Sequence, residues 1–172
     1  RPFGPKLFND AVGERVDGWK LPANAMEVVN SSANQTDILQ MFHDWMALLN
    51  RGLHVTPVGS SDSHDVARHF VGQGRTYIRC DDSDPGNIDV AAAAESFAQG
   101  KVLISYGLLA ELTIDDKFRS GDLAVGENPE LDVHLRVLAP RWTSVSQIWI
   151  YANGHRIREI DLTQMELDRR SK

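Results

Sequence analysis

In the first part of the chain, the order of hydrophobic and polar residues predicts strands separated by helices. Residues 25–30, Ala-Met-Glu-Val-Val-Asn, are short and rich in β-branched side chains, which is typical of a buried strand. A helix ending at Gly52 is predicted next, because apolar side chains then recur at helical spacing. They are Ile38, Phe42, Trp45, Met46 and Leu49. Residues 53–58 predict a second strand that leads into Gly59. Strand, helix and strand in this order indicate a βαβ unit of a parallel sheet.

The same alternation continues to about residue 107. Residues 76–80 and 101–106 are strand-like, and residues 87–99 predict a helix because they contain four consecutive alanines and precede a glycine. The first 24 residues, rich in proline, glycine and asparagine, predict an irregular lead-in. We therefore expect residues 1–107 to form an α/β unit.

After Gly107 the pattern changes to strands alone. Strand-like runs cover residues 110–115, 131–138 and 145–151, and the loops between them are rich in Gly, Asp, Asn and Pro. Asn153-Gly154 predicts a type I′ hairpin turn. Residues 108–172 are therefore expected to form a small antiparallel module of the β-sandwich type, ending in a charged tail.

Composition narrows the class of protein and its partners. The chain has 172 residues, of which 42% are hydrophobic and 24% charged, as in a folded globular protein. Its net charge of −6 argues against a nucleic-acid partner, since phosphate binding needs a basic surface. The single cysteine, Cys80, excludes an intrachain disulfide and a cysteine-based zinc site. No apolar run is long enough to predict a membrane span.

The first residues suggest that the sequence is a piece of a longer protein. They read Arg1-Pro2-Phe3-Gly4-Pro5, with neither an initiating methionine nor the apolar stretch of a signal peptide. The cellular compartment therefore stays open.

The segment Gly59-Ser60-Ser61-Asp62-Ser63-His64 carries the most specific chemistry in the sequence. It follows directly on a predicted strand, and functional groups of α/β proteins gather on loops at the carboxyl ends of strands. Asp62 offers a hard oxygen and His64 a neutral imidazole nitrogen, which together suit Zn²⁺, Mn²⁺ or iron. The alternative is an ordinary surface turn, in which Asp and Ser cap the backbone.

This segment and the strand at residues 25–30 together resemble the C-terminal half of PHP (polymerase and histidinol phosphatase) metallohydrolases. The family's last motif reads Gly-Ser-Asp-x-His and is preceded by a strand of the Leu-Glu-Ile-x-Asn type. Residues 71–77 and 100–107 are similar to the CehA/McbA-like branch, which often continues into a β-rich domain. The resemblance implies the C-terminal portion of a (β/α)7-type, TIM-barrel-like barrel followed by the β module.

The resemblance also implies roles for particular residues. Asp62 and His64 match the family's final metal ligands, and Glu27 and Asn30 match a strand motif near the pocket without being ligands. Arg75 matches a position common in the branch and has no assigned role. One departure is the second serine before Asp62, which is also seen in that branch. A larger departure is the absence of the family's His-x-His motif, since no histidine precedes His43.

Two further residues close to the motif are candidates on position alone. Asp65 could orient His64 as a hydrogen-bond partner, or be a plain turn residue. His69, five residues after His64, could enter the pocket or lie outside it.

The expected function is a fragment of a metal-dependent hydrolase of the phosphoesterase type, acting on a small-molecule ester. The branch resemblance adds carbamates and carboxyl esters to phosphate esters as substrates. Two ligands are too few for a catalytic metal, so the fragment alone is expected to be inactive. Exposed edges of a partial barrel would favour self-association. The alternative is a non-catalytic binding or assembly module, in which Trp142 and Trp149 form a stacking platform unless they pack into a core.

Overall fold

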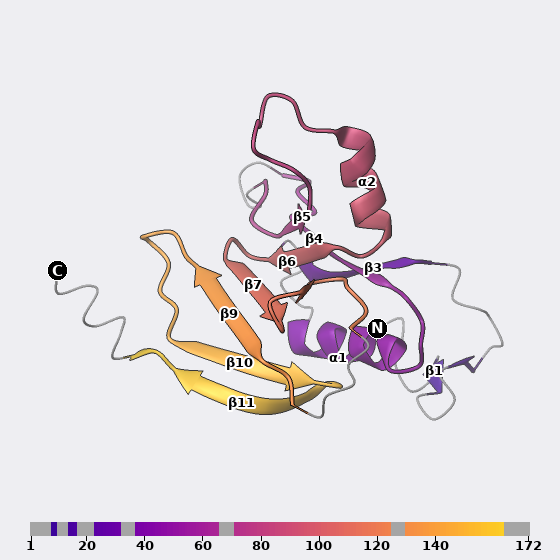
Figure 1. The fold of residues 1–172 in the computed structure, drawn as a ribbon. Coiled ribbons are helices and arrows are strands. Elements are labelled where there is room, and N and C mark those ends of the chain that lie inside the picture. The colour runs from indigo at the N-terminus through magenta and orange to yellow at the C-terminus, as the bar shows by residue number, and fades with distance from the viewer. Residues whose placement is uncertain are drawn as a thin grey trace.

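The computed structural model describes residues 8–9, 14–16, 23–31, 37–65, 71–124 and 130–163. Within these ranges the protein is a mixed α/β structure made mostly of strands, with two helices (Figure 1). The strands form a parallel pair and several small antiparallel sheets. The mixed class and the β-rich second part are therefore as predicted. The described strands do not close into a barrel.

The predicted βαβ unit is present. Strand β3 (Ala25–Asn30) and strand β4 (Thr56–Ser60) pair in parallel, and helix α1 (Ile38–Leu49) connects them. Asp37 caps the N-terminus of the helix, and its carboxylate accepts a hydrogen bond from the backbone N–H of Gln40.

The small core lies between α1 and the two parallel strands. Its most buried side chains are Met26, Val28, Leu48 and Val55. Trp45 packs against them, and its indole nitrogen donates to the carbonyl of Val55 at 2.8 Å. The polar end of this large side chain is thereby satisfied, as packing at the edge of a core requires.

An irregularity in β3 decides which side chains share a face. Glu27 pairs with Val58, but the next pair along the register is Val29 with Gly59, so one residue is inserted at Val28. Val28 and Val29 are consequently both buried, although consecutive residues of a regular strand point to opposite faces.

The second helix belongs to an antiparallel unit. Strand β5 (Arg75–Ile78) pairs antiparallel with strand β6 (Val102–Ser105), and helix α2 (Val90–Ala98) lies between them in sequence. Asp89 caps the N-terminus of the helix, and none of the helix residues is buried. The strands and the helix agree with the predicted ranges to within three residues.

The β module consists of a three-stranded sheet and a hairpin. Strand β7 (Leu109–Ile114) lies between β8 (Phe118–Arg119) and β9 (Val133–Leu138). Strands β10 (Gln147–Ala152) and β11 (His155–Asp161) form the hairpin.

The hairpin turn is of the predicted type. Asn153 and Gly154 have φ angles of 52° and 84°, and positive values at both central residues define type I′.

Three short strands were not predicted. Strand β8 has two residues and follows a turn in which Asp115 and Asp116 both have positive φ. Strands β1 (Phe8–Asn9) and β2 (Glu14–Arg15) pair antiparallel. The expectation that residues 1–24 are irregular throughout is therefore wrong for these four residues. Such short pairs leave no periodic signal in a sequence.

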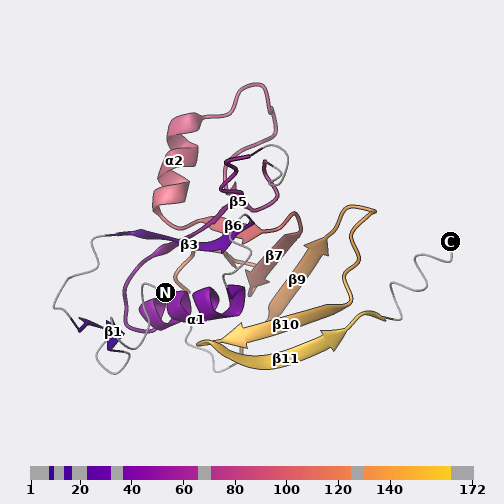
Figure 2. The ribbon, with the colours of Figure 1, turned by 180° about the vertical axis from the view of Figure 1, so that it is seen from behind.

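The β hairpin packs on helix α1 from the side opposite β3. Both views show α1 between β3 and the β10–β11 hairpin (Figures 1 and 2). The rings of Phe42 and Tyr151 meet edge to face at 5.2 Å, and the side-chain amide of Asn50 donates to the carbonyl of Asn153 at 3.2 Å. Contacts therefore cross the domain boundary predicted near residue 107.

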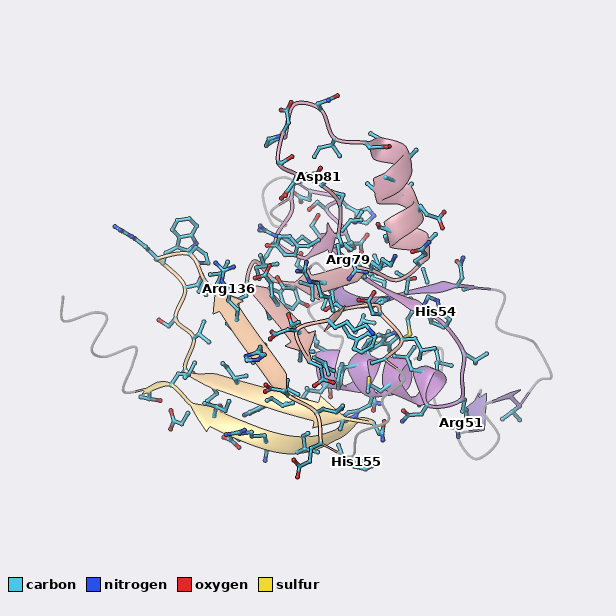
Figure 3. All side chains as sticks on the ribbon, in the orientation of Figure 1. Arg51, His54, Arg79, Asp81, Arg136 and His155 are labelled. Atoms are coloured by element: carbon cyan, nitrogen blue, oxygen red, sulfur yellow. The ribbon has the colours of Figure 1, made fainter. Side chains whose placement is uncertain are left out.

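A second link across the same boundary is an ion pair. Arg79 directly follows β5 and is labelled in Figure 3. Its guanidinium donates two hydrogen bonds to the carboxylate of Asp122, at 2.6 and 3.1 Å. These bonds, with a third from the backbone N–H of Arg119, hold the pKa of Asp122 at about 2.

Among the described residues, no helix has the length and apolar character needed to cross a membrane.

Candidate functional site

The candidate site lies where four chain segments meet at one edge of the α/β unit. The parallel strands β3 and β4 both end there, at Asn30 and Ser60. The phenol of Tyr106, just beyond β6, donates to the carbonyl of Asn30 at 3.1 Å and so brings the end of β6 to the same edge. Because β5 runs antiparallel to β6, β5 begins there, at Arg75. Carboxyl ends of strands are where α/β proteins place functional groups.

Two glycines allow β4 and β5 to approach closely. A Cβ on Gly59 would overlap the carbonyl oxygen of Arg75, and a Cβ on Gly74 would overlap the carbonyl oxygen of Ser60. The hydroxyl of Thr76 also bridges the backbone of Gly59, accepting from its N–H at 2.9 Å and donating to its carbonyl at 2.8 Å. The start of the Gly59–His64 segment is therefore held firmly against β5.

Ser31 fastens the middle of that segment. Its hydroxyl donates to the carbonyl of Ser61 at 3.3 Å and accepts from the backbone N–H of Gly74 at 3.1 Å. Its own backbone N–H donates to the carbonyl of Ser60 at 3.1 Å. One small residue after β3 thus ties β4 and the approach to β5 together, a role for which the sequence carried no signal beyond its position.

Asp62 adopts a left-handed backbone conformation, with φ of 47°. Such conformations cost a non-glycine residue about 1 kcal/mol or more, although aspartate tolerates them better than most. The turn allows the Asp62 carboxylate to accept a hydrogen bond from the Asn30 side-chain amide at 3.2 Å. The same conformation is adopted by Asp115 and Asp116 in the turn before β8, so the hydrogen bond from Asn30 and not the backbone angle distinguishes Asp62.

The imidazole of His64 is oriented by the backbone of the same turn. Its Nδ1 lies 2.7 Å from the carbonyl oxygen of Asp62 and 3.5 Å from that residue's carboxylate. A nitrogen at this distance from a carbonyl oxygen carries the proton, so the lone pair of neutral His64 is on Nε2. A metal-bound histidine is commonly fixed in this way by a hydrogen bond from its other nitrogen.

Glu27 is bound to its neighbours at both carboxylate oxygens. One accepts a hydrogen bond from the Asn30 amide at 3.0 Å, and the other accepts a hydrogen bond from the hydroxyl of Ser60. The β3 irregularity makes this possible, because residues three apart in a regular strand face opposite sides. Glu27 and Asn30 therefore lie beside the loop that carries Asp62.

Three further candidates remain, of which the structure describes two. Arg75 is exposed, and its guanidinium lies beside Gly107 in the turn after β6. Asp65 is half-buried, and His69 lies outside the described residues.

Tyr106 is a site residue that was missed. Partial burial raises the pKa of its phenol above the ordinary value. Its place at the end of a predicted strand was the available signal.

Asp62 and His64 offer the oxygen and nitrogen donors of a divalent metal site, although the ring nitrogen near the Asp62 carboxylate is Nδ1 and not Nε2. The carboxylate of Asp62 and Nε2 of His64 are both exposed, with 45% and 78% of the side-chain surface accessible. Within the described ranges, however, no three Asp, Glu, His or Cys residues form a group that could hold an ion. The described residues therefore supply two donors, and further ligands are needed to complete a site.

No protein-family model, curated protein or solved structure matches this chain.

Proposed function

We propose that the chain carries the last metal-ligand loop of a PHP-type metal-dependent hydrolase, with Asp62 and His64 as two of the ligands. The observation that supports this most directly is the orientation of His64, whose Nδ1 faces the carbonyl of Asp62 while Nε2 remains available. The second is the placement of both residues at the shared carboxyl edge of β3 and β4.

The substrate that we propose is a small-molecule ester. Asp62 and His64, together with further ligands, would hold a divalent ion, which would supply an activated water and Lewis-acid chemistry when bound. The residues of this chain position the ligand loop: Ser31 and Thr76 fix its backbone, and Asn30 holds the Asp62 carboxylate. Among small-molecule esters, we propose phosphate esters as the first class to test. The resemblance to the CehA/McbA-like branch adds carbamates and carboxyl esters.

We also propose that this chain alone is inactive as a hydrolase. A catalytic metal has at least three protein ligands and an open position, whereas the described edge supplies two. Strand β3 pairs only with β4 among the described strands. Its other edge is a suitable place for self-association or for the strands that would bring the missing ligands.

Binding of Mn²⁺, followed by broadening of backbone amide resonances, tests the ligand assignment. Paramagnetic broadening detects the weak affinity expected of an incomplete site. We expect it to centre on residues 60–64 and to disappear in the variants Asp62→Ala and His64→Ala. The matched control is the pair Asp132 and His134, which has the same spacing and a contact of 3.4 Å on the β module.

Three outcomes are informative. Loss of broadening in the loop variants and its retention in Asp132→Ala and His134→Ala supports the ligand role. If residues 132–134 broaden in the unaltered chain to the same extent as residues 60–64, Mn²⁺ binds any exposed Asp-x-His pair, and the proposal fails. Absence of broadening at residues 60–64 in the unaltered chain also refutes it, and Asp62 is then a turn residue.

A second candidate is a binding module that uses the aromatic side chains after β9. Trp142 is 89% exposed, which is unusual for so large an apolar group. Trp149 is on the outer face of β10, with the guanidinium of Arg156 over its ring at 5.1 Å, while Ile148 and Ile150 face inward. Binding of a sugar or protein partner that is lost in Trp142→Ala, but not in Asp62→Ala, would favour this function.

A further inference from the structure

The side chain of Asn30 lies between two carboxylates. Its amide nitrogen is 3.0 Å from Glu27 Oε2 and 3.2 Å from Asp62 Oδ2. The two oxygens can therefore be no farther apart than the sum of these distances. An amide nitrogen has two hydrogens, so one Asn30 side chain can donate to both acceptors at once.

The bridge offsets an unfavourable interaction. Two carboxylates at this separation repel each other, and each is stabilised by a hydrogen bond to its ionised form. Asn30 supplies both hydrogen bonds without adding charge. Alanine would leave the repulsion without these bonds, and aspartate would add a third carboxylate at the same point.

The position of Asn30 is determined by the backbone as well as by these bonds. The phenol of Tyr106 donates to the Asn30 carbonyl at 3.1 Å, and the irregularity at Val28 places Asn30 on the face of Glu27. Glu27 is in turn bound by Ser60 at its other oxygen. The chain of contacts therefore runs from β3 through Asn30 to the ligand loop.

We infer that Asn30 is a positioning residue that holds the Asp62 carboxylate in its ligand orientation and sets the charge of the site. The inference rests on the proposed function, because it concerns the affinity of the Asp62 and His64 loop for a divalent cation. Asn30 acts through Asp62 and is not itself a ligand. A purely structural residue at this place would affect folding alone.

Replacement of Asn30 by aspartate separates a role in metal binding from a role in folding alone. In EDTA, Asn30→Asp should lower the melting temperature, since a third carboxylate adds repulsion. With Mn²⁺ the same variant should bind about tenfold more tightly, because the added charge faces the cation. Asn30→Ala should bind about tenfold more weakly, as expected when the partner of a metal ligand is removed. The control is Asn87→Asp, in an exposed turn before α2.

The outcomes distinguish this inference from the metal-ligand proposal. If the unaltered chain binds Mn²⁺ and folded Asn30→Ala binds it equally tightly, the inference fails alone, because alanine removes the hydrogen bond to Asp62 without adding a charge. If only Asn30→Asp binds, the new carboxylate has created a ligand, and both the inference and the metal site of the unaltered chain fail. If neither binds, both fail. Where Asn30→Asp does not fold, Asn30→Ala decides alone: about tenfold weaker Mn²⁺ binding supports the inference, and unchanged binding refutes it.

Discussion

The aromatic ring of Tyr151 on the β10–β11 hairpin meets the ring of Phe42 on helix α1 at 5.2 Å, with an angle of 67° between the planes. This edge-to-face contact joins the two parts that the sequence pattern separates near residue 107. We expect Phe42→Ala and Tyr151→Ala to be coupled by about 1 kcal/mol in a double-mutant cycle of urea unfolding. Trp149 lies on the outer face of the same strand, so Trp149→Ala should show no coupling to Phe42→Ala. A coupling indistinguishable from zero for Tyr151 would mean that the hairpin does not pack on α1.

The close approach of β4 and β5 predicts a large effect of a single methyl group. Gly74→Ala places a Cβ onto the carbonyl of Ser60, which is backbone and cannot rotate away. The free energy of unfolding should fall by about 2 kcal/mol or more, measured by urea denaturation. Gly86→Ala is the control, since its Cβ would make only an ordinary contact with Asp84. Equal effects of the two substitutions would contradict the close packing at Gly74.

The left-handed conformation of Asp62 predicts an order of stability among its variants. Asp62→Gly loses the hydrogen bond from Asn30 but gains backbone freedom at positive φ, so the two effects partly offset. Asp62→Ala loses the same hydrogen bond and keeps the strain. We expect the glycine variant to be more stable than the alanine variant by about 1 kcal/mol in thermal or urea unfolding. The reverse order would show that Asp62 does not adopt this conformation in solution.

The Arg79–Asp122 ion pair predicts a pH dependence of stability. The pKa of Asp122 is about 2 in the folded protein, chiefly because of its hydrogen bond from Arg79, and rises to the ordinary value of 3.8 on unfolding. A lowered folded pKa gives stability that is present above pH 4 and is lost as the pH falls toward 2. Partial exposure of both side chains reduces the contribution to about 1 kcal/mol.

Unfolding midpoints measured from pH 7 to pH 2 check this. The difference in unfolding midpoint between the unaltered chain and Asp122→Asn should be constant from pH 7 to pH 5 and should shrink below pH 4. Asp82→Asn, in an exposed loop, provides the baseline. A difference that persists unchanged at pH 2 would assign the effect to packing and not to charge.

Much of the α/β unit and of the hairpin could be predicted because their signals are local. The helical spacing of Ile38, Phe42 and Trp45 needs only a dozen residues to be visible, and Asn153-Gly154 determines its turn almost alone. The antiparallel pairing of β5 with β6 had no such signal, since strand pairing depends on residues far apart in the chain. The hydrogen bond from the side chain of Asn50 to the carbonyl of Asn153 could not be predicted for the same reason.

In the candidate site, too, features with a local sequence signal could be predicted and contacts between distant residues could not. Asp62 and His64 follow a predicted strand directly, so their place at its carboxyl end could be inferred. The bridge between Glu27 and Asp62 could not be derived from spacing, because it depends on one inserted residue at Val28. Bulges arise from pairing between strands and carry little signal within a single strand. Tyr106 was missed because its partner, Asn30, is distant in sequence.

The connectivity of these sheets has a consequence for the order of folding. The β10–β11 hairpin joins residues that are neighbours in sequence, and such hairpins form in about 1–10 μs. The parallel pair of β3 and β4 requires the whole of α1 to cross between them, which makes its formation slower. Stretches of the C-terminal module should therefore gain protection against amide exchange before the Asp62 loop does. The loop that we propose as a ligand carrier would be among the last parts of the chain to become ordered.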